Sequence, residues 1–261
     1  MRRCLLPILS IAALVALAPA PATGHSPGAA TRPTRAHPRV EAARRYAESR
    51  AGDVAFAVIG RRGRFAGYHV RRTAPAASVF KVMLLVALLR KRHDSGLSVA
   101  DRALLGPMIR RSDSVAATVV RDRVGVRRIR HLARVAGMRD FRYHAVWGLS
   151  RTSPRDQVRF MYRLGSYVPG RHRAYAMRLL SHIVRSQRWG IGRVRPRGWR
   201  LCFKGGWGSG SGRVDHQVAL LTRHRHRVSV AIFTQFDPTH AYGERTLRGV
   251  AARLLSGLQA R

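Results

Sequence analysis

The 261 residues of this chain suit one globular domain, or one domain built of two lobes, with a core large enough to need no disulfide staples. Fifty Lys and Arg against twelve Asp and Glu give a formal charge of +38, but the arginines are spread along the chain, without the stripe interleaved with aromatics that is typical of nucleic-acid binders. The composition therefore argues against a small disulfide scaffold and a nucleic-acid partner, and it predicts a basic surface able to accumulate on anionic cell-wall polymers.

The first 22 residues have the pattern of a signal peptide. Arg2 and Arg3 precede an apolar run from Leu5 to Leu17, and small residues at positions 18–22 can supply the cleavage site. This run of 13 residues is interrupted by Pro7 and is too short to span a bilayer as a helix. We therefore predict a secreted or cell-wall-associated protein that is not an integral membrane protein.

Residues 23–40 are rich in Pro, Gly, Ala and Thr, which predicts a flexible linker before a folded domain over 41–261. After removal of the signal peptide Cys202 is the single cysteine, so no intramolecular disulfide is expected.

The rest of the chain predicts strands at both ends and helices between them. A helix over 41–51 is followed by a hairpin of strands 54–60 and 67–70, and a buried apolar helix runs from Ser78 to about Arg92. Short helices broken at Pro107 and near Ser112 fill 97–135.

Two further helices are expected, one capped at Ser153 and ending near Gly165, and one over 171–187. Strands over 199–204, 217–222 and 228–236 and a helix over 240–258 close the chain. This order predicts a three-layer α/β (α+β) fold, in which an antiparallel sheet made from both chain ends is flanked by helices and a helical lobe is inserted.

Ser78 and Lys81 form a Ser-x-x-Lys pattern at the start of the buried helix. The spacing places both side chains on one helix face, so a neutral Lys81 amine can take the proton of Ser78 as the hydroxyl attacks an acyl carbon. Only Lys81, Lys91 and Lys204 among the fifty basic residues are lysines, and a lysine, unlike an arginine, can lose its proton when desolvated. A helix-capping serine followed by a solvated lysine remains the alternative.

Two later segments carry related groups. Ser112-Asp113-Ser114 stands at a break between helices, where a hydroxyl can pass a proton to a leaving group, although a simple helix cap is the alternative. Lys204-Gly205-Gly206 ends a predicted strand and leads into Trp207 and Ser209. Glycines there let a substrate lie along the strand edge and leave backbone N–H groups for an oxyanion, although such a segment is usually only a turn.

Ser-x-x-Lys, Ser-Asp-Ser and Lys-Gly-Gly, in this order, resemble the S-x-x-K, S-D-N and K-T-G patterns of the penicillin-binding and serine β-lactamase superfamily, and most closely the class A β-lactamase-related enzymes. The resemblance extends from about residue 41 to the C-terminus and implies a β-lactamase/transpeptidase-like fold. It implies Ser78 as the acylated nucleophile, Lys81 as its base, Ser112 as a proton shuttle, and Lys204 as the group that holds Ser112 and favours an anionic substrate.

The resemblance also implies an oxyanion hole made by the backbone N–H groups of Ser78 and Trp207. Substrate contacts are expected at Gly205, Gly206, Trp207 and Ser209, with no metal and no cofactor. Asp113 is expected to be structural. Ser114 stands where the family prefers Asn.

Two departures from the family pattern bear on activity. Gly205 stands where the family prefers Thr or Ser, so a side-chain contact to a substrate carboxylate is missing unless Ser209 or Ser211 replaces it. No Glu occurs between Glu48 and Glu244, whereas class A β-lactamases use a loop Glu to direct the deacylating water. The stretch 138–154 is short for that loop and offers Asp140 as its single acid.

We therefore expect a secreted serine hydrolase, class A β-lactamase-like or D-alanyl-D-alanine carboxypeptidase-like, that acts through a Ser78 acyl-enzyme on a lactam, amide or ester. The substrate would be a β-lactam or a peptidoglycan peptide. The alternative is a non-catalytic basic wall-binding domain, whose binding would survive Ser78→Ala and fade with salt. Two other features are weaker: the His-containing run 223–227 falls in a tight turn without a third metal ligand, and Trp189, Trp199 and Trp207 can stack on a sugar but are more typical of core or rim positions.

Overall fold

The computed structural model describes residues 38–208 and 213–258. The predicted signal peptide, nearly all of the predicted linker and the candidate substrate contact Ser209 lie outside the described residues. Within the described ranges, no helix combines the length and the apolar composition needed to cross a membrane.

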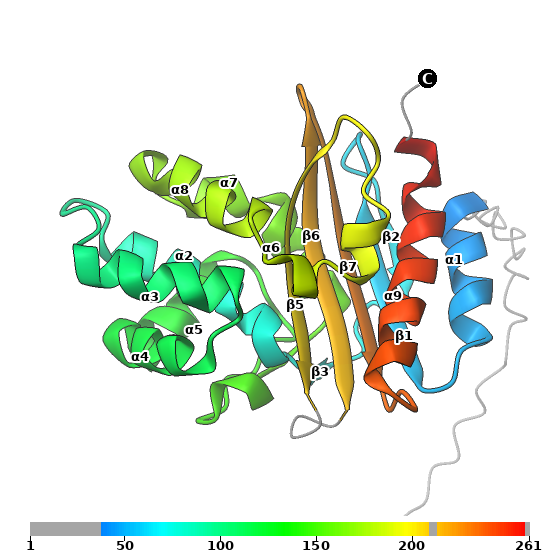
Figure 1. Ribbon diagram of the computed structural model, residues 1–261, viewed down its shortest axis with the longest axis horizontal. Coiled ribbons are helices and arrows are strands. Elements are labelled where there is room, and N and C mark those ends of the chain that lie inside the picture. Colours follow the sequence, from blue (N-terminus) through cyan, green and yellow to red (C-terminus); the bar gives the residue numbers. More distant parts are fainter. Residues whose placement is uncertain (1–37, 209–212, 259–261) are drawn as a thin grey trace, which may run out of the picture. The chain divides into compact units, whose positions relative to one another are not determined.

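A five-stranded antiparallel sheet forms the middle of the fold, with strand order β2-β1-β7-β6-β5 (Figure 1). Its strands come from both ends of the chain: β1 (Asp53–Ile59), β2 (Phe65–Tyr68), β5 (Arg200–Gly208), β6 (Val214–Arg223) and β7 (His226–Gln235). Six of the seven residues of β1 are buried in succession, because helices cover both faces of the sheet. The predicted three-layer architecture is confirmed.

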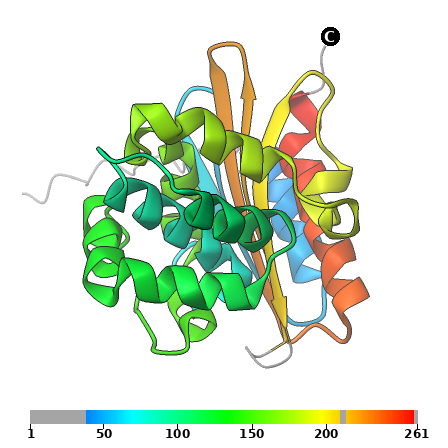
Figure 2. The ribbon, with the colours of Figure 1, turned by 60° about the vertical axis from the view of Figure 1, so that its left-hand side comes forward.

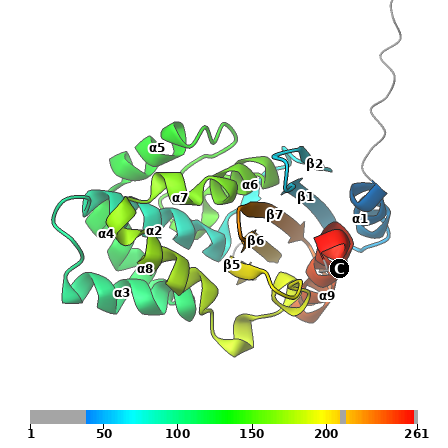
Figure 3. The same ribbon diagram turned by 90° about the horizontal axis from the view of Figure 1, so that it is seen from above.

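One face of the sheet is covered by α1 (Pro38–Glu48) and α9 (His240–Leu255), which pack side by side (Figures 1 and 3). The other face is covered by α6 (Pro154–Tyr162), which lies against β1, β6 and β7, and by α8 (Gly170–Ser181), which lies against β5. A two-stranded ribbon of β3 (Ala74–Pro75) and β4 (Arg151–Thr152) stands apart from the main sheet.

The inserted helical lobe surrounds α2 (Phe80–Lys91), whose residues from Val82 to Leu89 are all 2% exposed or less (Figure 2). A helix that is apolar all round must be covered on every side, so the lobe is organised about this helix. The remaining helical segments of the described chain are α2 (Phe80–Lys91), α3 (Val99–Arg110), α4 (Ser114–Val124), α5 (Val126–Val135), α7 (Leu164–Tyr167), and the 3₁₀ turns η1 (Ala77–Val79), η2 (Trp147–Leu149), η3 (Arg185–Gln187), η4 (Gly190–Arg193) and η6 (Ser256–Leu258).

The predicted helix break at Pro107 was wrong, since α3 continues through this residue to Arg110. A proline disfavours helical geometry in the residue before it partly through a clash with that residue's Cβ, and here that residue is Gly106. Elsewhere α1 begins at Pro38, three residues before the predicted start, and the predicted 171–187 helix ends at Ser181.

Candidate active site

Ser78 lies in the 3₁₀ turn η1, directly before α2, as the sequence pattern predicts. The segment leading to it is held on two sides: the Ala76 N–H donates to the carbonyl of Ser150 at 2.7 Å, and the His216 ring nitrogen Nε2 lies 3.1 Å from the carbonyl of Pro75. Ala77 has a φ of 44°, in the left-handed region that a non-glycine residue occupies only at a cost. The nucleophile candidate therefore sits on a fixed and strained turn.

Lys81 follows Ser78 by one helical turn and is fully buried. Its Nζ lies 2.8 Å from Ser78 Oγ, 2.6 Å from the main-chain oxygen of Ser112 and 3.2 Å from Ser112 Oγ. The alternative of a solvated lysine next to a helix-capping serine is therefore wrong, because Lys81 is buried. The amine is enclosed between the two serines.

Ser112 stands in the short connection between α3 and α4, where the break was predicted. Its φ of 61° is left-handed, which turns both its carbonyl and its hydroxyl toward the Lys81 amine. The Ser112 Oγ also lies 2.8 Å from Lys204 Nζ. Asp113 caps α4 by accepting the Ala116 N–H at 2.8 Å, which is a structural contact of the kind expected for it.

Lys204 reaches this cluster from the sheet. It is fully buried on β5, and its Nζ donates to the Gly205 carbonyl at 2.7 Å in addition to the Ser112 contact. Lys204-Gly205-Gly206 lies inside the strand and not at its end as predicted, because pairing with β6 continues to Gly208. The fold thus brings four residues together from separate segments: Ser78 and Lys81 from η1 and α2, Ser112 from the connection between α3 and α4, and Lys204 from β5.

Gly206 allows β5 to touch the nucleophile turn. A Cβ built on Gly206 would lie 2.8 Å from the backbone nitrogens of both Ser78 and Val79, so any side chain at this position would push the strand away. Trp207 is the next residue, and β5 is an edge strand of the sheet. The predicted pair of oxyanion donors, the N–H groups of Ser78 and Trp207, therefore comes from backbone segments in close contact.

Burial changes the acidity of both lysines. It lowers the pKa of Lys81 to about 8, although the negative charge of Asp113 acts in the opposite direction. Burial, together with the positive charge of Lys81, lowers the pKa of Lys204 well below its usual value. Two amines that share the Ser112 hydroxyl in a buried site thus favour states in which at least one of them is neutral.

Gly205 has no side chain to offer a substrate, and its outer side is covered. A Cβ at this position would meet the Trp189 ring at 3.0 Å, and Trp189 is only 7% exposed. The space that a Thr or Ser side chain would occupy at this position is thus filled by the Trp189 indole.

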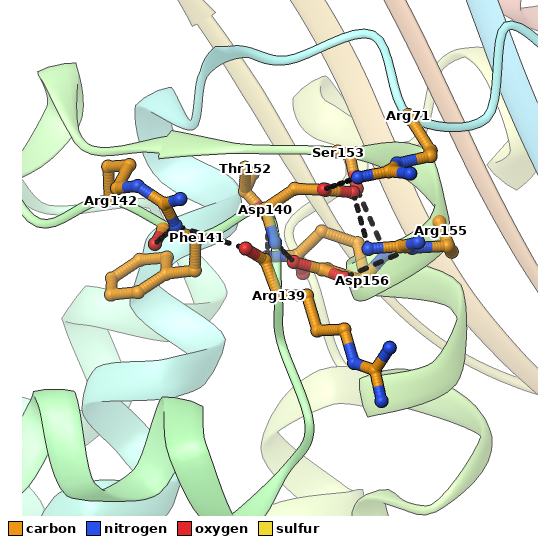
Figure 4. A network of polar contacts seen from close by, with 10 residues as sticks. Arg71, Arg139, Asp140, Phe141, Arg142, Thr152, Ser153, Arg155 and Asp156 are labelled. Atoms are coloured by element: carbon orange, nitrogen blue, oxygen red, sulfur yellow. Dashed lines mark hydrogen bonds and ion pairs between the residues drawn. The ribbon is translucent and has the colours of Figure 1, made fainter. Parts of the chain in front are cut away.

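Asp140, the single acid of the 138–154 stretch, is part of an ion-pair network (Figure 4). Its Oδ2 accepts the Ser153 hydroxyl at 2.7 Å and lies 3.0 Å from Arg155, while its Oδ1 lies 3.6 Å from Arg71. Asp156 joins the network, accepting the Asp140 N–H at 2.7 Å. Both oxygens of the Asp140 carboxylate have partners that hold the loop to the start of α6.

Two site residues were missed in the sequence. Ser114 Oγ lies 3.3 Å from Lys81 Nζ, so the position where the family prefers Asn still offers a polar contact. Trp147, in η2, places its ring centre 5.0 Å from Lys81 Nζ and donates its indole N–H to Thr118 at 3.1 Å. No local sequence signal pointed to Trp147, because its contact with Lys81 arises only when the loop that carries it packs beside α2.

No group of three His, Cys, Asp or Glu side chains in the described ranges lies close enough together to hold a metal ion. The histidine-containing run 223–227 covers the last residue of β6, the two-residue turn 224–225 and the first two residues of β7.

Solved structures share the fold of this chain. A β-lactamase from Sphaerobacter thermophilus DSM 20745 is 22% identical with a TM-score of 0.73, covering 85% of this chain and 98% of that one. The chromosome-encoded β-lactamase of Vibrio parahaemolyticus is 14% identical with a TM-score of 0.75, covering 85% of this chain and all (100%) of that one. A protein named PBP-A is 15% identical with a TM-score of 0.72, covering 84% and 95% of the two chains.

No curated protein sequence matches the chain. A sequence profile described as the beta-lactamase enzyme family matches residues 95–258, a range that contains Ser112 and Lys204 and begins after Ser78 and Lys81. This match spans more than half of the sequence, and the fold and the motif order agree with it. The chain therefore belongs to the beta-lactamase enzyme family.

Proposed function

We propose that this protein is a serine hydrolase that forms an acyl-enzyme at Ser78 with a β-lactam or a peptidoglycan peptide. The observation that carries the proposal is the position of the buried Lys81 amine, 2.8 Å from Ser78 Oγ. A base that takes a hydroxyl proton must lie within hydrogen-bond reach of it and must be able to exist uncharged near neutral pH. Lys81 meets both conditions.

The hydrogen bonds of Lys81 favour the direction of transfer. The Ser112 carbonyl can only accept, so the amine donates a hydrogen bond to it, and the lone pair of a neutral amine remains available for the Ser78 hydroxyl. Ser78 Oγ then bonds to the carbonyl carbon as its proton moves to Lys81. The backbone N–H groups of Ser78 and Trp207 stabilise the oxyanion.

Ser112 connects the base to the leaving group. In the second step the carbon–nitrogen bond breaks, Ser112 donates its proton to the departing nitrogen, and Lys81 returns a proton to Ser112. Lys204 orients the Ser112 hydroxyl from the other side, at 2.8 Å. A substrate carboxylate near Lys204 would stabilise its ammonium form and so assist binding.

We further propose that the acyl-enzyme is long-lived, which is the behaviour of a penicillin-binding or carboxypeptidase-like enzyme. The support is that the chain has no Glu between Glu48 and Glu244, while Asp140 is committed to Ser153, Arg155 and Arg71. The loop therefore has no Glu, and its Asp140 is already bound by other residues, so no loop carboxylate is free to direct water at the ester.

The intact mass of the mature protein, followed over time after mixing with benzylpenicillin, tests both statements. A mass increase that persists is expected, and Ser78→Ala should give none. A transient adduct with loss of the lactam would instead indicate a β-lactamase, and the absence of an adduct would contradict the acyl-enzyme. The alternative of a non-catalytic wall-binding domain receives no support from the family match.

We also propose that the protein is exported, on the pattern of residues 1–22. Protein recovered from the culture medium with an N-terminus near residue 23 would support this, and retention of Met1 on all of the protein would contradict it.

A further inference from the structure

The two ends of the β-sheet differ in charge. The acids of the sheet lie at one end: Asp53 begins β1, Asp215 is the second residue of β6, and Asp237 comes two residues after β7. The site of the proposed reaction lies toward the same end, since Gly206 pairs with His216. The opposite end, which we call the basic end, is formed by three segments that contain eight arginines and no Asp or Glu: 61–64, 197–200 and 223–227.

Strand pairing places the three segments of the basic end side by side (Figure 1). Segment 61–64 is the turn between β1 and β2, and segment 223–227 contains the turn between β6 and β7. The last residue of β1 pairs with the fourth residue of β7, so these two turns leave the sheet at the same end. Segment 197–200 leads into β5 there, because the first residue of β5 pairs with a residue near the end of β6.

Contacts between residues connect the three segments. The Arg227 guanidinium lies 5.3 Å from the ring centre of Tyr162, and a Cβ on Gly63 would lie 3.7 Å from the Tyr162 hydroxyl, so Tyr162 lies between the two turns. A Cβ on Gly198 would lie 3.6 Å from Arg223 Nε. The basic end is therefore one continuous surface.

The arginines of the basic end face solvent and have no carboxylate partner in the part of the chain that the structure describes. Arg223 is half-buried, and the other seven are exposed. None of the eight forms an ion pair with a described Asp or Glu. When such cations contact a polyanion, the counterions condensed on the polymer are released, which favours binding. The basic end therefore has the charge of a polyanion-binding surface.

The spread of these charges indicates a polymer as the partner. Neighbouring strands are about 4.8 Å apart, so the three segments extend over roughly 15–20 Å. A single small anion accepts hydrogen bonds only from groups within about 3 Å of its oxygens, so it could not contact all three segments at once. A linear polyanion repeats its charge along its length and could contact all of them.

The basic end lacks the side chains that would recognise nucleobases or a bilayer. Base stacking needs exposed aromatic rings, and Trp199, the single aromatic residue of the three described segments, is 2% exposed. Phe65 follows the first segment and is 39% exposed, but the Arg159 guanidinium lies 5.1 Å from its ring centre. No large apolar side chain of the three segments is exposed for insertion into lipid. The surface therefore suits a polymer that is recognised by its charge.

We propose that the basic end binds a linear anionic polymer of the cell wall and so holds the enzyme close to its substrate. The binding is additional to the acyl-enzyme chemistry, and the choice of a cell-wall polymer rests on the proposed peptidoglycan substrate and on the proposed export. Along β5, Gly206 is six residues from Arg200, which corresponds to about 20 Å in a strand. A polymer bound at the basic end would therefore leave Ser78 accessible.

The test compares two variants that lose the same charge at different places. The basic-end variant replaces one exposed arginine of each segment: Arg62→Gln, Arg197→Gln and Arg225→Gln. The matched control replaces three exposed arginines of α5, which packs on α2 and α4 in the helical lobe: Arg127→Gln, Arg128→Gln and Arg134→Gln. An attraction that depended on net charge alone would weaken equally in both variants.

Titration calorimetry with poly(glycerol phosphate) at 0.15 M salt measures the binding, because charges more than about 8 Å apart are largely screened there. The basic-end variant should bind at least about tenfold more weakly than the wild type, and its affinity should depend less steeply on salt, since fewer counterions are released. The α5 control should stay within about threefold of the wild type. Equal losses in the two variants, or no binding by the wild type, would overturn the proposal.

Two further probes test the class of partner. Oligothymidylate with the same number of phosphates, and phosphatidylglycerol vesicles compared per accessible phosphate, should bind no more tightly than poly(glycerol phosphate). Tighter binding of either probe would overturn the cell-wall polymer in favour of a nucleic acid or a membrane.

Acylation by benzylpenicillin separates this inference from the proposed function. Both variants should react at the wild-type rate, which also shows that they are folded. Normal acylation without polymer binding would overturn the role of the basic end alone, whereas polymer binding without any adduct in the wild type would overturn the proposed acyl-enzyme alone.

Discussion

Lys81 and Ser112 are joined by two contacts: the Lys81 amine lies 2.6 Å from the main-chain oxygen of Ser112 and 3.2 Å from its hydroxyl. The left-handed backbone of Ser112, with φ of 61°, makes both contacts possible for one residue. The same hydroxyl reaches Lys204 at 2.8 Å. Ser112, in the break between α3 and α4, thus contacts both lysines, and its carbonyl engages a Lys81 N–H so that the lone pair of the neutral amine is available for Ser78.

Ser112→Gly and Ser112→Ala separate the hydroxyl from the backbone. Both remove the proton shuttle and should slow acylation by penicillin by about a hundredfold or more. Glycine accepts a positive φ, whereas alanine does so at a cost of about 1 kcal/mol, so the alanine variant should have the lower free energy of unfolding. Urea titration measures this difference, and equal stability of the two variants would contradict the backbone role of Ser112.

Lys81→Met should abolish acylation and raise the free energy of unfolding at pH 7. Burial lowers the Lys81 pKa from 10.5 to about 8, which costs the folded state about 3 kcal/mol when the unfolded chain is protonated. The loss of the Lys81 contacts to Ser78, Ser112 and Ser114 offsets part of this gain.

The stability difference between Lys81→Met and the wild type should depend on pH. Between pH 8 and 10.5 the unfolded chain binds more protons at Lys81 than the folded one, so the wild type gains stability with rising pH there and the advantage of Lys81→Met should shrink. Lys91→Met is the control, because Lys91 is exposed and its removal should change the unfolding free energy by less than about 0.5 kcal/mol. A variant less stable than the wild type at pH 7 would speak against a desolvated amine.

The acylation rate should rise with pH and level off above about 8, since the neutral form of Lys81 is the base. Asp113→Asn should move this midpoint to lower pH, because Asp113 is the charge that raises the Lys81 pKa, while asparagine still caps α4. Stopped-flow acylation at saturating penicillin from pH 6 to 10 measures both profiles. A midpoint that moves to higher pH in Asp113→Asn, or an acylation rate that does not change with pH, would contradict the role of Lys81 as the base.

Gly206→Ala should impair both acylation and stability. The new Cβ would lie 2.8 Å from two backbone nitrogens of the nucleophile turn, which cannot rotate away as a side chain would. Gly170→Ala is the matched control, since nothing lies within 4 Å of its Cβ site at the start of α8, and it should not lower stability through any clash. Melting curves and acylation rates of the two variants provide the comparison; normal acylation by Gly206→Ala would mean that β5 need not touch Ser78.

Local sequence patterns predicted the helices and strands and the Ser78–Lys81 pair, and the family resemblance predicted the rest of the four-residue cluster. The apolar run after Ser78 specified a buried helix, and helical spacing placed Lys81 beside Ser78. The motif order then placed Ser112 and Lys204 near them through the family resemblance, and the structure brings all four together. Their catalytic roles remain predictions.

Long-range features were beyond prediction from the sequence. Nothing local to Trp147 or His240 indicates that their rings would reach Lys81 and Trp207, because those contacts arise when loops and helix ends dock on other elements. The end of β5 was misplaced for a similar reason: glycines indicate a turn locally, but pairing with β6 holds them in the strand. Tertiary hydrogen bonds outweighed local preference there.

The most direct test of the account locates the penicillin on the chain. Trypsin cleaves after Arg72 and Lys81, and the resulting peptide from Thr73 to Lys81 contains Ser78 as its only serine. Cleavage after Arg111 and Arg121 places Ser112 in a separate peptide, 112–121. After reaction with benzylpenicillin and digestion, the added mass is expected on peptide 73–81. Added mass on peptide 112–121, or on neither peptide, would contradict Ser78 as the nucleophile.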